Sequence, residues 1–388
     1  MQKFFSRLFP TGEPPEPLTP GVYHHMFPEN VESPNRLHLR IEPNGNGLLL
    51  VNASTVLHLN STATEHVYFW FEGKSQGEAA QEIARRYRVS QTKAFTNQSQ
   101  IREQIMSLVN TPDLDPVLFI GLDRTEPYSE SPPAPYRLDC ALTYKTDLSG
   151  TYDPLARARV DTELTTEEWM EILGKAWDFG IPHVTFTGGE PCLWDDLPKL
   201  IAHSENLGQI TGVLTNGLRL ADKSYLTDLD QSGLDHILIT FEPGNKKSVK
   251  GLEAALASDI FTAVHLSVSE AGAVQELDEL CAMGVTSVSL STDREQIGSL
   301  EEARDHAASV GLDLIWDLPV PYSSRNPISL ELESQLTGDG RAWLYVEPDA
   351  DILPSQGIDV ILGNILRDSW QDIWDQAQAW YSTQTANK

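Results

Sequence analysis

Hydrophobic and polar positions divide the chain into two patterns, and the first occupies its N-terminal third. Short apolar runs alternate there with Asn-Gly turn signals, which is typical of strands. The predicted strands are residues 37–41, 47–51 and 56–59. Stretches with helical spacing follow, each after a residue that caps helices. They begin at Asn60 or Ser61, at Ser75 with Glu78 three residues later, and at about Ser90. This order predicts a small winged-helix-like α+β domain over residues 35–110.

From Tyr136 onward, strand and helix patterns alternate strictly. The predicted strands are residues 137–144, 183–187, 211–214, 236–241, 263–268, 287–290 and 312–316. The predicted helices are residues 166–179, 196–207, 223–232, 249–258, 274–283 and 300–310. Repeated βα units predict a parallel sheet with helices outside, either doubly wound or a full or partial barrel. Ligands of such α/β folds bind at the C-terminal ends of the strands.

Two stretches rich in Pro, Glu and Ser or Gly predict where the domains end. They divide the chain into a flexible tail, the α+β domain, a linker, the α/β domain and a C-terminal extension. These parts are residues 1–34, 35–110, 111–135, 136–325 and 326–388.

Charge and cysteine content exclude several classes of protein. The chain has 28 Lys and Arg against 56 Asp and Glu, a net charge of −28, which disfavours binding to nucleic acid or to anionic membranes. No apolar run approaches the length of about 20 residues that spans a bilayer, and no signal peptide is visible, so we predict a cytoplasmic protein. Three separated cysteines, Cys140, Cys192 and Cys281, exclude a disulfide framework and a C-x-x-C metal site.

Candidate ligand-binding residues lie where two neighbouring predicted strands end. The first strand end continues into Gly-Gly-Glu-Pro and the second into Thr-Asn-Gly. Two glycines let the backbone approach a ligand closely, and a glutamate accepts hydrogen bonds from an amine. The predicted cofactor-binding residues are Gly188, Gly189, Glu190, Pro191, Thr215 and Asn216.

The stretch F-T-G-G-E-P-C-L-W-D-D-L, followed by G-V-L-T-N-G-L-R-L, resembles the radical S-adenosylmethionine (radical SAM) family. The resemblance covers about residues 136–316. It implies a partial (βα)6 barrel in which the Gly-Gly-Glu-Pro motif binds the amino group of the methionine part of SAM. The lead-in to the family's C-x-x-x-C-x-x-C motif is also present, as Ala141-Leu142-Thr143-Tyr144-Lys145.

The chain departs from the family at the three cysteines of that motif. Thr146, Gly150 and Asp153 stand at the positions where the family has the thiolates that hold a four-iron four-sulfur cluster. Soft thiolates are the usual ligands of such clusters. We therefore expect no iron–sulfur cluster and no metal site, no resident cofactor, and at most weak binding of SAM.

Both flanking regions resemble accessory domains of the same family. Residues 343–374 resemble the SPASM extension of radical SAM peptide-modifying enzymes, with Ser355 at an expected cysteine and Ala350 at an expected glycine. Residues 35–108 resemble the PqqD-like domain that binds leader peptides. Aromatic residues of this domain, Tyr68, Trp70 and Phe71, exceed one helical face, and we expect some of them to pack against a partner domain or a peptide.

Together these features predict a pseudoenzyme of the radical SAM/SPASM type that has lost its cluster. It would act as a peptide- or protein-binding partner in a peptide-modification system and have no catalytic residues of its own. The expected partner carries a basic face, because the chain is acidic, and a related active radical SAM enzyme is one candidate. The alternative is an enzyme that binds SAM or another nucleotide at residues 188–191 and performs non-radical chemistry.

Overall fold

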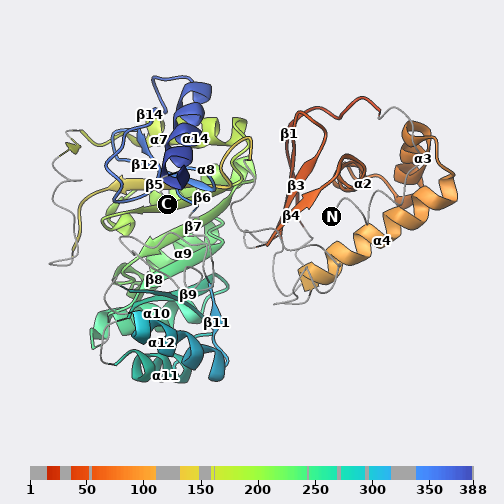
Figure 1. The fold of residues 1–388 in the computed structure, drawn as a ribbon. Helices are drawn as coiled ribbons and strands as arrows, with labels where there is room; N and C mark the ends of the chain where they lie inside the picture. The colour runs from red at the N-terminus through yellow and green to blue at the C-terminus, as the bar shows by residue number, and fades with distance from the viewer. Residues whose placement is uncertain are drawn as a thin grey trace. The chain divides into compact units, whose positions relative to one another are not determined.

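The chain forms two compact units, residues 1–127 and 128–388, in a computed structural model. We call them unit 1 and unit 2 and describe each by itself (Figure 1). The structure describes residues 15–26, 36–51, 55–110, 132–147, 159–160, 162–242, 244–268, 272–292, 297–315 and 338–386.

Unit 1 contains a four-stranded antiparallel sheet in the order β1-β2-β3-β4 (Figure 1). The strands are β1 (Gly21–Met26), β2 (Arg36–Ile41), β3 (Gly47–Val51) and β4 (Thr55–Leu59). Strands β2 to β4 lie where the sequence predicted them. Strand β1 lies inside residues 1–34, which we predicted as a flexible tail, so at least this part of the tail is a strand of the sheet.

The described residues of unit 1 also form three helices, whose starts match the predicted caps. They are α2 (Ser61–Phe71), α3 (Gln76–Tyr87) and α4 (Gln91–Asn110). The Asn60 side chain accepts a hydrogen bond from the Ala63 amide at 2.9 Å, and Ser75 and Glu78 form the reciprocal capping box. The apolar core lies between the sheet and the helices. It consists of Leu37, Leu39, Ile41, Leu49, Val51, Leu57, Val67, Trp70, Ile105, Leu108 and Val109.

Unit 2 is built on a sheet of ten strands in the order β11-β10-β9-β8-β7-β6-β5-β12-β13-β14 (Figure 1). Its parallel strands are β5 (Arg137–Thr143), β6 (His183–Gly188), β7 (Ile210–Thr215), β8 (His236–Thr240), β9 (Phe261–Ser267), β10 (Ser287–Ser291) and β11 (Asp313–Leu314). The helices between them are α7 (Thr166–Asp178), α8 (Leu197–Leu207), α9 (Lys223–Gln231), α10 (Lys246–Leu256), α11 (Ala273–Ala282) and α12 (Ile297–Ser309). Short 3-10 turns follow β6 and β7, η1 (Pro191–Leu193) and η2 (Arg219–Ala221). The predicted alternation of strands and helices around a parallel sheet is therefore confirmed.

The two faces of this sheet differ in polarity because successive side chains of a strand point to opposite faces. One set of alternate residues, such as Leu138, Val184 and Ile237, joins the apolar cluster that the helices cover. The other set includes a small apolar cluster of Leu214, Leu238 and Ala263, but many of its residues are polar and contact one another. Its members include Arg137, Asp139, His183, Thr185, His236, His265, Ser289 and Ser291.

The C-terminal region continues the sheet. Strand β12 (Trp343–Val346) pairs parallel to β5. Strand β13 (Asp351–Leu353) pairs antiparallel with β12, and β14 (Gly363–Asn364) pairs antiparallel with β13. Helix α14 (Trp370–Ala386) follows. Within the extension predicted for residues 326–388, β12 thus joins the edge of the parallel sheet. Among the residues that the structure describes, no helix combines the length and apolarity needed to cross a membrane.

Candidate functional site

The two glycines after β6 lie against the end of strand β5. The Gly189 amide donates to the Thr143 carbonyl at 2.7 Å, and the Glu190 amide donates to the Lys145 carbonyl at 2.8 Å. A Cβ at Gly188 would lie 2.2 Å from the Thr143 oxygen, and a Cβ at Gly189 would lie 2.2 Å from the Lys145 oxygen. The absence of side chains at the two glycines thus lets the backbone at the end of β5 lie close to them.

Glu190 joins this turn to the next strand end. Its carboxylate accepts hydrogen bonds from the Cys192 amide at 2.9 Å, the Thr215 hydroxyl at 2.7 Å and the Asn216 amide at 2.8 Å. The residue is only 2% exposed, and burial raises the pKa of its carboxyl, while the three donors oppose that shift. Through these three hydrogen bonds Glu190 holds the turn after β6 against the end of β7.

Asn216 extends the same network to the segment after β5. Its side-chain amide donates to Asp147 at 2.6 Å, and its side-chain oxygen accepts from the Leu218 amide at 3.0 Å. Thr215 accepts a further hydrogen bond from the Gly217 amide at 3.1 Å. Pro191 begins the turn η1 that the Glu190 side chain caps. All six predicted site residues therefore come together, in one junction of three strand ends.

A polar group that sequence reasoning missed lies beside this junction. Thr187 immediately precedes Gly188 and is 1% exposed, yet its hydroxyl has no hydrogen-bond partner among the described residues. A buried hydroxyl without a partner destabilises a fold, so its presence at a strand end favours a polar ligand there. One threonine in a strand of mixed residues gives no sequence signal of this kind.

The three cysteines lie apart from one another in unit 2. Cys140 and Cys192 are buried in the apolar cluster, and burial raises the pKa of both thiols well above the ordinary value. Cys281 is exposed on α11. No group of three or more His, Cys, Asp or Glu side chains suited to a metal ion occurs among the described residues. Of the three substituted motif positions, Thr146 is described, whereas Gly150 and Asp153 lie outside the described residues.

A second carboxylate network lies at the end of β12, next to the end of β5. Glu347 is completely buried and accepts hydrogen bonds from the Tyr144 hydroxyl at 2.6 Å and from Arg159 at 2.6 and 2.9 Å. Arg159 also contacts Asp359. The C-terminal strands thus hold the strand end from which the family's cysteine motif would start.

Parts of the chain are similar to known proteins. The sequence model of the radical SAM superfamily matches residues 140–258. The PqqA peptide cyclase of Granulibacter bethesdensis is 27% identical over 290 residues, which are 63% of this chain and 75% of the cyclase.

Solved structures show the same fold. Streptococcus suis SuiB bound to precursor peptide SuiA matches with a TM-score of 0.58 and 14% identity, over 89% of this chain and 87% of SuiB. SuiB bound to S-adenosylmethionine matches with the same score and identity, over 87% and 86%.

These comparisons overturn the prediction about cofactors. We predicted no cofactor, weak SAM binding at most, and no iron–sulfur cluster. That prediction is wrong, because the matched superfamily binds SAM and an iron–sulfur cluster and the SuiB structure is described with SAM bound.

The residues of this chain fit SAM but do not fit the iron–sulfur cluster. The buried Thr187 hydroxyl beside Gly188 and Gly189 fits a polar ligand such as SAM at the end of β6. The cysteines do not fit the family's three-thiolate arrangement, since two are buried in the apolar cluster and the third is on a surface helix. The chain is thus similar to the radical SAM superfamily over residues 140–258 and to a peptide cyclase over 63% of its length, and it shares the fold of SuiB.

Proposed function

We propose that this protein binds a peptide within a peptide-modification system and that unit 1 is its recognition module. The observation that carries this proposal is the outer strand of the unit 1 sheet. Strand β4 pairs with β3 on one side and has no strand on its other side among the described residues. The outer edge of a strand offers a row of amides and carbonyls with which an extended peptide forms main-chain hydrogen bonds.

The relatives support a peptide as the partner. One structure of SuiB is described with a precursor peptide bound, and the bacterial relative is named for a peptide substrate. The resemblance of residues 35–108 to PqqD-like domains points to the same class of ligand. In this proposal the C-terminal strands form the SPASM-like part, and the chain acts mainly by binding and assembly.

Electrostatics divide the partner's contacts between the units. Unit 1, residues 1–127, contains 11 Lys and Arg against 14 Asp and Glu, a net charge of −3, whereas unit 2, residues 128–388, contains 17 against 42, a net charge of −25. We therefore expect a partner with a basic face to contact unit 2 and not the peptide-binding sheet of unit 1. A related active enzyme is one candidate for that partner.

A second candidate function is SAM-dependent, non-radical chemistry in unit 2. The observation that favours it is the unpartnered Thr187 hydroxyl beside the junction of residues 188–191, 215 and 216. We assign SAM to this strand end, where the Thr187 hydroxyl would hold it beside Gly188 and Gly189 and Glu190 would position the loops. When bound there, SAM would supply its methyl group to a nucleophile of the substrate and would leave as S-adenosylhomocysteine.

The peptide proposal is tested by site-specific photocrosslinking in the cell. A photoreactive phenylalanine at His58, a half-buried residue of β4, should capture a peptide that mass spectrometry identifies. The matched control carries the same group at Phe261, an exposed residue of β9 that is half accessible. Peptide adducts at Phe261 but not at His58 would contradict the assignment to unit 1.

The SAM proposal is tested by calorimetry on the full chain. Thr187→Val keeps the side-chain shape, removes the hydroxyl and should weaken SAM binding by about tenfold, the value of one hydrogen bond of about 1.4 kcal/mol. Thr227→Val on the exposed side of α9 is the control and should change nothing. A SAM-derived product formed only with the captured peptide present would favour the enzyme over the binding role.

A further inference from the structure

Residues 15–26 lie on unit 1 as an extended segment whose Leu18 and Tyr23 pack, partly buried, against the core of the unit. Strand β1 pairs antiparallel with β2 from Gly21 opposite Ile41 to Met26 opposite Arg36. Pro15, Pro17 and Pro20 precede it, and prolines favour an extended chain. No buried side chain of unit 1 comes from residues 15–25, whereas β2, β3 and β4 each supply some.

Aromatic stacking holds the strand part of the segment on helix α2. The Tyr23 ring meets the Tyr68 ring edge-on at 4.9 Å between centroids. The His25 ring stacks on Phe71 at 5.4 Å and lies 5.5 Å from Trp70. The aromatic cluster that we expected to pack against a partner domain or a peptide is thus covered by the chain's own strand.

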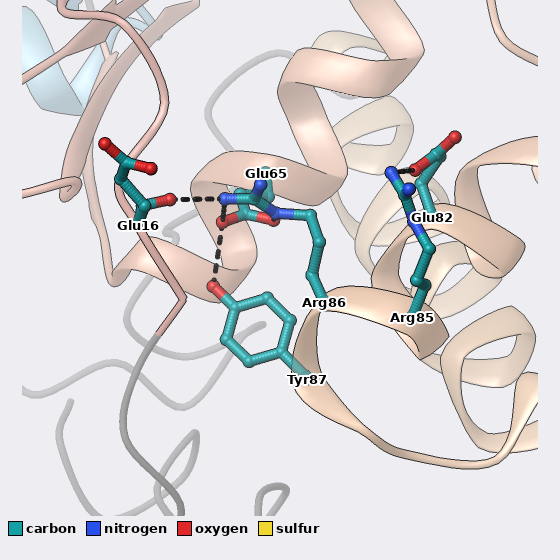
Figure 2. Close-up of polar contacts among 6 residues, drawn as sticks. All are labelled: Glu16, Glu65, Glu82, Arg85, Arg86 and Tyr87. Atoms are coloured by element: carbon teal, nitrogen blue, oxygen red, sulfur yellow. Dashed lines mark hydrogen bonds and ion pairs between the residues drawn. The ribbon is translucent and has the colours of Figure 1, made fainter.

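Two contacts hold the part before the strand. Leu18 packs against the apolar core cluster of unit 1. Figure 2 shows the other contact, in which Arg86 of α3 donates from Nη2 to the backbone carbonyl of Glu16 at 2.6 Å.

Glu65 of helix α2 holds the Arg86 side chain in position for this contact. The Nε and Nη2 atoms of Arg86 donate to the two carboxylate oxygens of the buried Glu65, at 2.6 and 2.8 Å, and the Tyr87 hydroxyl donates to Glu65 at 3.1 Å (Figure 2). Because Glu65 neutralises the guanidinium, the remaining donor capacity suits a neutral carbonyl, which any peptide backbone supplies.

We propose that the β2 edge, the aromatic side of α2 and Arg86 form a second site for an extended peptide, which residues 15–26 fill within the same chain. The peptide that fits has an aliphatic residue followed, five residues later, by an aromatic residue and then by an aromatic or imidazole residue two positions on, as Leu18, Tyr23 and His25 do. This site lies at the edge of the sheet opposite β4, so it is independent of the peptide proposed there.

The resident segment controls access to this site. Main-chain ladder bonds form with any sequence, so a competing peptide loses none of them and needs only comparable anchors. Residues 15–26 occupy the site in preference to a free peptide because they are covalently linked to unit 1, which gives them an effective concentration in the millimolar range or above. A free peptide therefore binds only when the segment is weakened or released.

Fluorescence anisotropy with a labelled synthetic peptide of residues 14–27 tests the proposal on the full chain. The double variant Tyr23→Ala/His25→Ala should bind this probe at least about tenfold more tightly than the unaltered chain, whose site is filled. A probe with the same two alanines should bind the double variant about tenfold less tightly than the natural probe. Equal binding by both receptors, or none by a double variant whose unit 1 still melts cooperatively, would overturn the proposal.

A second measurement applies if the double variant does not fold. A protease site inserted between Phe27 and Asn35 lets the unaltered chain fold first and be cleaved afterwards. The labelled probe should then replace the released N-terminal fragment in the protein peak of a gel filtration run. If the fragment stays bound and no probe exchanges at millimolar excess, the segment is a permanent strand of the fold and the proposal fails. The crosslink at His58 reports on β4 separately in either case.

Discussion

The two units of this protein differ in where they place their polar groups. Unit 1 has an apolar core between a small antiparallel sheet and three helices, with its polar backbone groups at sheet edges. Unit 2 buries its apolar residues under the helices and its polar residues, including His236 and His265, on the other face of the parallel sheet. Its strand ends are fixed by buried carboxylates, Glu190 and Glu347.

The difference indicates which kind of ligand each unit suits. A sheet edge recognises an extended chain through its backbone and a few side-chain anchors, and it tolerates exchange of one strand for another. A junction of strand ends fixed by buried hydrogen bonds holds a small ligand, because rigid loops keep polar groups in place. We therefore expect substitutions in unit 2 to change stability strongly and those at the edges of unit 1 to change binding.

The largest effect is expected for Glu190→Ala. It removes the acceptor of three buried donors, on Cys192, Thr215 and Asn216, and each buried donor left without a partner costs about 1–3 kcal/mol. We expect unit 2 to lose about 3–5 kcal/mol in urea unfolding, while unit 1 unfolds as before. Glu190→Gln keeps one acceptor oxygen and should lose less than half as much. An alanine variant within about 1 kcal/mol of the parent would show that the junction is not rigid.

The second prediction concerns acid. Burial lowers the pKa of His236 and of His265 to about 4, with Arg137 adding to the shift at His236. Both imidazoles are therefore neutral in the folded unit and take up protons on unfolding below their ordinary pKa of about 6.5. The stability of unit 2 should fall as pH drops from about 6.5 towards 4, by about 2 kcal/mol per imidazole near pH 5.

Urea unfolding near pH 5 and near pH 7.5 measures this loss. His265→Gln should remove roughly half of the pH dependence. His306→Gln is the matched control, because His306 is a more accessible residue of α12 paired with Asp278. An unchanged pH dependence in His265→Gln would show that other groups of unit 2 cause it.

Local periodicity was sufficient to predict most of the fold. In unit 2 the apolar alternation places strands such as β8 within one or two residues of their observed bounds, because both the sheet and its helices bury regular sets of side chains. That the six candidate residues lie together could be predicted as well, since glycines and a capping glutamate directly after a strand are a local signal.

Contacts between distant segments could not be predicted in this way. The alternation in residues 21–26 is too short and too polar to stand out next to prolines, and β1 becomes a strand only by pairing with β2. The bond between Tyr144 and Glu347 joins residues 203 positions apart. The Thr187 hydroxyl is informative only because its surroundings leave it without a partner, which requires coordinates.

The third prediction separates the units by their charge. A labelled deca-lysine probe should bind the full chain mainly through unit 2 and weaken at least about tenfold between about 0.05 and 0.5 M salt, because screening shortens the range of exposed charges. The peptide of residues 14–27 should bind Tyr23→Ala/His25→Ala with less than about a twofold change over the same range, because its anchors are apolar rings and backbone groups. Equal salt dependence of the two probes would contradict the assignment of the basic partner to unit 2.

The smallest effects compare the same backbone strain in the two units. Arg88 and Ala350 are the described residues other than glycine with positive φ, at 52° and 74°. Arg88 is exposed after helix α3, so Arg88→Gly relieves the left-handed conformation without losing packing and should stabilise unit 1 by about 0.5–1 kcal/mol. Ala350 is completely buried in the turn between β12 and β13. There Ala350→Gly gains a similar amount but removes a buried methyl worth about 0.8 kcal/mol, so its net change should stay near zero. Thermal unfolding of the two variants measures both values, and a larger gain at Ala350 than at Arg88 would mean that the buried methyl contributes little to unit 2.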